Sequence, residues 1–136
     1  MKYDLETIKY INLFENLTGT HVKECLLNKE KLVFIVKAEE IRKAIGKNGF
    51  NIKKFENITN KRIKVVAYST DPILFVKSFI APITAKQIEL VEDVITIYVV
   101  GINEKGLLIG RDRKNLDALK DIVKKYYKEI KDVKIV

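Results

Sequence analysis

Apolar and polar positions along the chain follow a helical period and then a strand period, and this order occurs twice. Apolar residues recur at intervals of three and four from position 10 to position 17, which predicts an amphipathic helix. Asp4 is a candidate N-cap for that helix, and Gly19 is a candidate stop. The other elements predicted for the first half are strands at 22–27 and 31–36 around a turn at 28–30, a helix at 39–45, a turn at 46–49, a helix at 50–58 and a strand at 62–68.

The second half of the chain repeats the first. Placing Gly46 on Gly110, an offset of 64 (110 − 46), also places Asn51 on Asn115 without a gap. Only the last strand needs an offset of 70, so the second copy carries six more residues (70 − 64), which we expect in a longer last helix. The elements predicted here are a helix from Asp71-Pro72 to before Pro82, strands at 86–91 and 94–100, a helix at 104–109, a turn from 110, a long helix including 116–127 and a strand at 133–136.

Both copies predict the same fold of the α+β class, in the order helix, strand, strand, helix, helix, strand. Helices that cover one face of a three-stranded sheet, an α/β sandwich, bury the apolar faces of both kinds of element. The helical pair between the second and third strands is long enough to let those two strands run parallel. We therefore expect two domains, at residues 1–70 and 71–136.

Composition and charge favour a globular protein with a polyanionic partner. Hydrophobic residues make up 47% of the 136 residues, and 26 Lys and Arg against 18 Asp and Glu give a net charge of +8. Nucleic acid and an anionic membrane surface both fit that charge. No apolar run approaches the roughly 20 residues of a membrane span, so we expect a cytoplasmic protein without a membrane partner. With one cysteine and one histidine, we expect no disulfide, metal site or cofactor.

The segment at 44–52 has a pattern that fits phosphate binding. Gly46 can take a left-handed conformation and end one helix, and Gly49 lets a phosphate approach the backbone where the next helix begins. Lys47 adds a charge at the tip of the turn, and Ile45 and Ile52 offer an apolar border for bases. The pattern therefore predicts a clamp for the backbone of a single-stranded nucleic acid. A tight helix–helix connection without a ligand is the alternative.

Several segments resemble KH domains of the prokaryotic topology (type II), and as a pair they resemble the archaeal NusA family of transcription factors. The residues that carry this resemblance are 13–19 with Val22 and Cys25, 44–52, Phe75-Val76, Ala81-Pro82, 109–111 and 115–116. The resemblance implies two KH domains in tandem that bind single-stranded RNA during transcription elongation, pausing or termination. The resemblance also implies the RNA polymerase elongation complex as a further partner.

The turn of the second copy departs from this pattern, because it reads Gly110-Arg111-Asp112-Arg113 and lacks the closing glycine. One interpretation is structural, with Asp112 as the cap of the following helix. The other is that Arg111, Arg113 and Lys114 hold phosphate by charge in place of backbone contact.

Basic side chains gather around both turns, and no acid occurs between residues 42 and 55. Charged residues on a helix are often only a solvated face, but their shared position around two turns favours a basic track. The residues predicted to bind RNA are Arg42, Lys43, Ile45, Gly46, Lys47, Asn48, Gly49, Asn51, Ile52, Lys53, Lys54, Lys64, Gly110, Arg111, Arg113 and Lys114.

Two other functions stay open from the sequence. One is a KH module of the ribosome or of RNA-processing machinery, and the other is a protein–protein adaptor whose basic turns meet acidic partners. The adjacent acids at 39–40 and 92–93 lie in no Ser, His or metal constellation, so we expect no catalytic centre.

Overall fold

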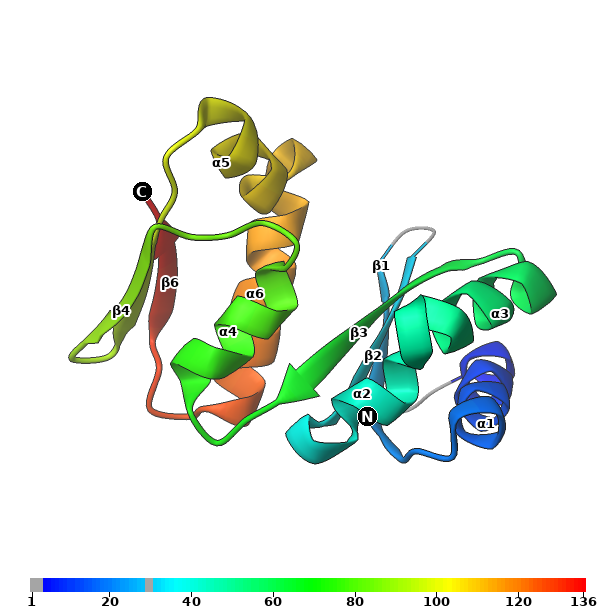
Figure 1. The fold of residues 1–136 in the computed structure, drawn as a ribbon. Helices are drawn as coiled ribbons and strands as arrows, with labels where there is room; N and C mark the ends of the chain where they lie inside the picture. The colour runs from blue at the N-terminus through cyan, green and yellow to red at the C-terminus, as the bar shows by residue number, and fades with distance from the viewer. Residues whose placement is uncertain (1–3, 29–30) are drawn as a thin grey trace. The chain divides into compact units, whose positions relative to one another are not determined.

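The computed structural model describes residues 4–28 and 31–136. The chain divides into two compact units, Met1–Ser69 and Thr70–Val136. In the described part, the fold is mixed α+β, with six α-helices and two three-stranded sheets (Figure 1). None of the described helices is long and apolar enough to cross a membrane.

The N-terminal unit is a helix followed by a hairpin, two short helices and a third strand. Its elements are α1 (Leu5–Thr18), β1 (Val22–Asn28), β2 (Lys31–Lys37), α2 (Ile41–Ile45), α3 (Phe50–Thr59) and β3 (Arg62–Tyr68), with 3-10 turns η1 (Ala38–Glu40) and η2 (Lys47–Gly49) before and after α2. The sheet order is β1-β2-β3, with β1 antiparallel and β3 parallel to β2. The predicted parallel pairing is therefore confirmed, since α2 and α3 form the crossover between β2 and β3.

Local sequence explains the ends of α1. The carboxylate of Asp4 accepts a hydrogen bond from the Thr7 N–H (2.8 Å), and Gly19 ends the helix in a left-handed conformation at φ 71°. The core beneath this helix contains three fully buried rings. Phe14 stacks on Phe34 at a centroid distance of 4.3 Å, and Phe55 meets both rings edge-on. These rings hold α1 and α3 against β2.

The C-terminal unit has the same order of elements. They are α4 (Pro72–Ile80), β4 (Gln87–Val91), β5 (Val94–Tyr98), α5 (Ile102–Ile109), α6 (Lys114–Tyr126) and β6 (Asp132–Ile135), with the 3-10 turn η3 (Arg111–Arg113) between α5 and α6. Asp71 caps α4 by accepting from the Ile73 N–H at 2.9 Å, as predicted. The sheet order β4-β5-β6 repeats one antiparallel and one parallel pair. Its core includes the fully buried Phe75, Ile95 and Ile97.

Some predicted boundaries were wrong. The helix predicted at 39–45 starts as the 3-10 turn η1, the strand predicted to reach residue 100 ends at Tyr98, and the helix predicted from residue 104 starts at Ile102. Of the six additional residues, only three lengthen the last helix (13 residues in α6 against 10 in α3), and the others fall in the connection to β6. The predicted hairpin turn at 28–30 includes residues 29 and 30, which lie outside the described residues.

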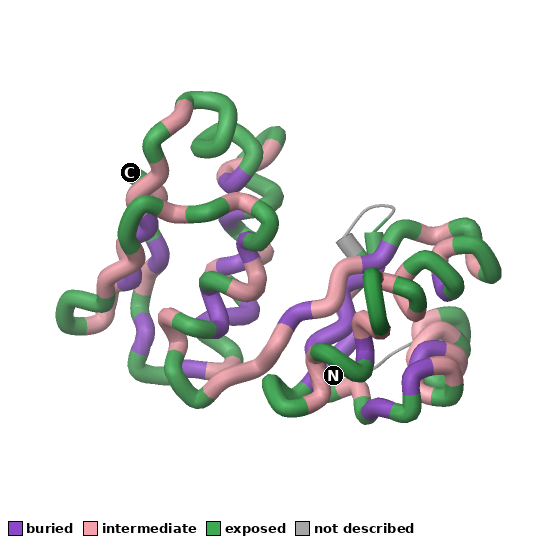
Figure 2. The backbone as a smooth tube through the Cα atoms, viewed as in Figure 1, coloured by how far each residue is buried: buried purple, intermediate pink, exposed green. Residues whose placement is uncertain are grey.

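Buried positions concentrate on the central strands and on the inner sides of the long helices (Figure 2). The segments that join α2 to α3 and α5 to α6 are instead exposed or partly exposed. Both glycine turns therefore lie at the surface of their own unit.

Candidate nucleic-acid interface

Glycine occupies both ends of the turn between α2 and α3. Gly46 has φ 79° and ψ 165°, a region that is essentially restricted to glycine, whereas Gly49 is left-handed at φ 75° and ψ 18°. Between them Asn48 also has a positive φ, 55°. The Gly49 N–H donates to the Gly46 carbonyl (3.1 Å), which closes the turn just before α3 begins. Gly46 therefore ends α2 as predicted, but its ψ of 165° places it outside the left-handed helical region that the sequence suggested.

Asn51 braces this turn from the first turn of α3. Its side-chain amide donates to the carbonyl oxygen of Lys43 at 2.9 Å, which ties α3 to the last turn of α2. A Cβ placed on Gly46 would lie 2.9 Å from the Asn51 backbone nitrogen, so no larger residue fits there. Asn51 is one of the residues predicted to contact RNA, but its side-chain amide nitrogen already has a partner within the fold.

The other side of the turn is open. A Cβ placed on Gly49 would meet no atom within 4 Å, and the side chains of Lys47 and Asn48 are exposed. The first N–H groups of a helical segment have no partner within the helix, and they carry the positive end of its dipole. An anion can therefore approach the backbone at Gly49 without displacing a side chain.

Five of the basic residues predicted around this turn are exposed on the α2–η2–α3 segment. They are Arg42, Lys43, Lys47, Lys53 and Lys54. Ile45 and Ile52 are partly buried beside them, and Ile52 packs against the core. The arrangement combines an open backbone, mobile positive charge and an apolar border.

Lys43 and Lys64 point elsewhere. The end of the Lys43 side chain lies against Gly19, since a Cβ built there would be 3.2 Å from its Cε and 3.4 Å from its Nζ. Its charge therefore lies at the carboxyl end of α1, where a cation is favourable. Lys64 alternates along β3 with Ile63 and Val65, which pack into the core under the helices, so it lies on the opposite face of the sheet.

Burial lowers the pKa of Lys64 to about 8, and the nearby charge of Lys31 lowers it further. Lys64 is thus still mostly protonated at neutral pH. Its position separates it from the surface around the glycine turn.

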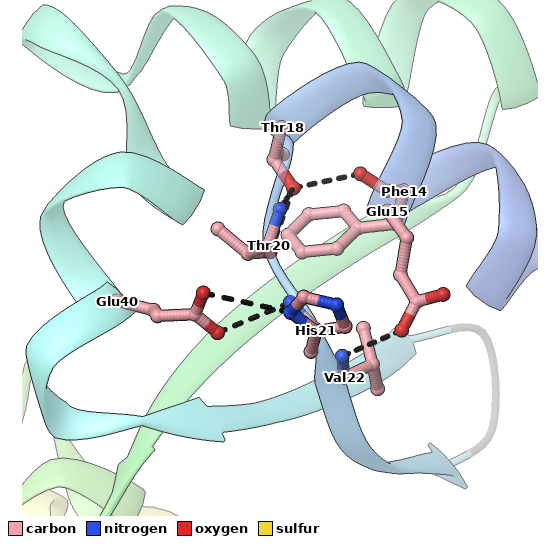
Figure 3. A network of polar contacts seen from close by, with 7 residues as sticks. All are labelled: Phe14, Glu15, Thr18, Thr20, His21, Val22 and Glu40. Atoms are coloured by element: carbon pink, nitrogen blue, oxygen red, sulfur yellow. Dashed lines mark hydrogen bonds and ion pairs between the residues drawn. The ribbon is translucent and has the colours of Figure 1, made fainter.

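A polar network fixes the loop between α1 and β1 next to the start of α2 (Figure 3). The carboxylate of Glu40 accepts from the His21 N–H at 3.1 Å, and its second oxygen lies 3.8 Å from the imidazole Nδ1. Glu15 accepts from the Val22 N–H at 2.7 Å. The Thr18 hydroxyl donates to the Phe14 carbonyl at 2.8 Å. Glu40 therefore links the segment before α2 to His21, the residue that precedes β1, a role that the sequence alone did not reveal.

The second turn has nearly the same backbone in spite of its different sequence. Gly110 has φ 78° and ψ 167°, Asp112 has φ 56°, and Arg113 is left-handed at φ 63°. Asn115 donates to the Leu107 carbonyl at 2.8 Å, as Asn51 does in the first unit. The side chains of Arg111, Arg113 and Lys114 are all exposed.

The interpretation of Asp112 as a helix cap is wrong. Arg113 takes the N-cap position of α6, and no side-chain capping hydrogen bond forms there. The carboxylate instead belongs to a residue in the middle of the turn, between two exposed arginines.

Sequence reasoning missed Phe50, which follows Gly49 and is 60% exposed. Its position was visible as an aromatic residue directly after the second glycine. The pattern for helices counted it only as the start of α3. Among the described residues, no group of His, Cys, Asp and Glu side chains could hold a metal ion.

A surface glycine turn between two short helices, packed on a sheet with one parallel pair, is the arrangement of a KH domain. The family model described as "KH domain" matches residues 9–84, more than half of the chain. The crystal structure of APE1850 is similar over 98% of this chain and 100% of that one, with a TM-score of 0.70 and 28% identity.

Curated relatives narrow the family further. A protein of Methanococcus vannielii is 33% identical over 100% of this chain and 80% of its own length, and one of Methanocaldococcus jannaschii is 30% identical over 96% and 73%. Both bear the name "Probable transcription termination protein NusA". The chain therefore belongs to the KH-domain family and, within it, to the family of archaeal NusA proteins.

Proposed function

We propose that this chain is a NusA-like transcription factor that binds single-stranded RNA in the cytoplasm during elongation, pausing or termination. The observation that carries the proposal is the turn from Gly46 to Gly49, whose outer side is open at Gly49. On this proposal the chain acts by binding RNA and has no catalytic step of its own.

Single-stranded RNA fits this site better than duplex does. A backbone notch accepts one phosphate at a time, and the apolar border of Ile45 and Ile52 offers contact to bases that are unpaired. The acid-free stretch from residue 42 to residue 55 supplies positive charge along the path of the strand. On this proposal Arg42, Lys47, Lys53 and Lys54 contact phosphates. Asn48 lies within the turn, and on this proposal its exposed side chain also contacts a phosphate.

We also propose that the chain holds two type II KH domains in tandem, at residues 1–70 and 71–136. The same order of elements and the same backbone at both turns support this division. In the second domain Arg111, Arg113 and Lys114 attract phosphate by charge around Gly110. That site is weaker because the Arg113 side chain stands where Gly49 leaves the first turn open.

The names of the relatives support transcription as the setting. In that setting the RNA polymerase elongation complex is the second partner that we propose. The names favour this role over a module of the ribosome or an adaptor of acidic proteins. In cells, crosslinking of this protein to nascent transcripts is the expected result.

The test is an anisotropy titration of single-stranded RNA, single-stranded DNA and duplex RNA at two salt concentrations. We expect single-stranded RNA to bind most tightly. Its affinity should fall by about 0.7 log units per log unit of salt for each phosphate engaged. Equal affinity for duplex and single strand at both salt concentrations would contradict the proposal.

A further inference from the structure

We propose that Phe50 is a stacking surface for one nucleobase of the strand whose phosphate lies at Gly49. The inference rests on the proposed function and adds a residue that determines how the bound strand is read. A base that stacks on this ring belongs to a nucleotide adjacent to the clamped phosphate, because Phe50 directly follows Gly49 in the chain.

The ring differs from the other phenylalanines of the N-terminal unit. Phe14, Phe34 and Phe55 are completely buried and form the core, whereas Phe50 is 60% exposed in the first turn of α3. A phenyl ring has no polar group to satisfy with water. Isolated exposed apolar residues are common on protein surfaces, so exposure alone does not indicate a ligand.

The surroundings of Phe50 favour a nucleobase as the group that contacts its ring. The ammonium of Lys54, one helical turn later, lies 5.9 Å from the ring centroid, so positive charge accompanies the aromatic face. The open backbone at Gly49 lies directly before the ring, and no acid occurs from residue 42 to residue 55. Aromatic rings beside a positively charged path are the combination that binds single strands, because every base offers a π-face.

The second unit lacks this feature. At the same offset of 64 residues, Lys114 replaces Phe50 as the first residue of α6. The stacking surface therefore belongs to the first turn alone, and the second offers charge at the corresponding position.

A direct test uses the absence of tryptophan from the chain, which gives Phe50→Trp a single reporter. A base that stacks on the indole quenches its fluorescence when RNA binds. Ile58→Trp is the matched control, since Ile58 is 57% exposed on the same helix but eight residues, or about 12 Å, further along. We expect quenching in Phe50→Trp and none in Ile58→Trp. Equal quenching in both variants, or in neither while RNA still binds, would overturn the inference.

Affinity gives a second test that separates stacking from charge. We expect Phe50→Ala to weaken binding of single-stranded RNA by about 5-fold to about 100-fold without changing the salt slope. Lys47→Ala should instead reduce that slope by about 0.7. Phe50→Tyr should bind as the parent does, whereas Phe50→Leu should bind weakly because it keeps apolar area but has no ring. Full affinity in Phe50→Leu would overturn stacking.

An RNA series with one abasic nucleotide moved along the strand locates the base. At one position the abasic RNA should bind the parent and Phe50→Ala equally, because the stacked base is already missing. If Phe50→Ala is weaker than the parent by the same factor at every position, the ring does not meet a particular base and the inference fails. If the parent protein binds no RNA at all, the proposed function fails, and this inference with it.

Discussion

Replacement of Gly49 by aspartate tests the phosphate clamp most directly, because it places a negative charge at the open side of the turn. A Cβ at this position meets no atom within 4 Å, so the side chain can be added without a steric clash. The backbone is left-handed at φ 75°, and Asp is among the residues that enter this region most readily. The equivalent position of the second turn already holds an arginine, Arg113, at φ 63°.

The magnitudes favour a loss of binding over a loss of folding. The left-handed backbone costs about 1–2 kcal/mol for a residue with a Cβ. A carboxylate at the amino end of α3 offsets roughly 0.3–1 kcal/mol of that cost. Against a bound phosphate about 4 Å away, the same charge is repelled by about 1–4 kcal/mol, the range between water and a protein surface. We therefore expect RNA affinity to fall at least about 5-fold while the unfolding free energy changes by about 1 kcal/mol.

The assay is a titration of single-stranded RNA into the parent, Gly49→Asp and Gly49→Asn, with urea unfolding of each. Asparagine has nearly the same shape and the same tolerance of left-handed backbone, so it isolates the charge. The difference between the two variants should shrink as salt is raised, because salt screens exposed charges. Unchanged RNA affinity of Gly49→Asp at low salt would refute the reasoning.

Three further predictions concern stability and reactivity. Gly46→Ala should lower the unfolding free energy of the N-terminal unit by roughly 2 kcal/mol in urea titrations, because its Cβ would press on backbone 2.9 Å away. Gly106→Ala, whose Cβ would lie in open space within α5, should instead raise the unfolding free energy by up to about 1 kcal/mol. The hydrogen bond from Lys120 lowers the pKa of Asp132, so the ionised carboxylate stabilises the fold fully above the ordinary pKa of 3.8 and loses this effect as pH falls through the lowered pKa. The unfolding free energy of Asp132→Asn should therefore lack this dependence on pH in acid titrations. Burial raises the pKa of the Cys25 thiol to about 12, so a thiol reagent at neutral pH should label it only at the rate of unfolding.

The order of elements could be predicted from the sequence because each signal is local. Helical spacing, the caps Asp4 and Asp71 and the stop at Gly19 act within a few residues of one another, and all three are confirmed. The length of the helical pair between the second and third strands allowed a parallel pair, which both units contain. These signals needed no knowledge of which surfaces meet.

The destinations of long polar side chains could not be predicted in the same way. Lys43 extends to Gly19, Asn51 bonds a carbonyl of α2, and Lys64 lies on the sheet face away from the helices. Each of these positions depends on how elements distant in the chain pack together. A count of the basic residues near a motif includes such side chains, because position in the sequence does not determine the direction in which a side chain points.

Comparison of the two turns separates what folds this structure from what makes it a binding site. The features shared by both are a glycine with ψ near 166° and an asparagine five residues later, which bonds the preceding helix. The feature they do not share is the second glycine, since Arg113 adopts nearly the same backbone as Gly49. That glycine is therefore not required to form the turn. What it contributes is the absence of a side chain, and this matters only if something approaches the backbone from outside.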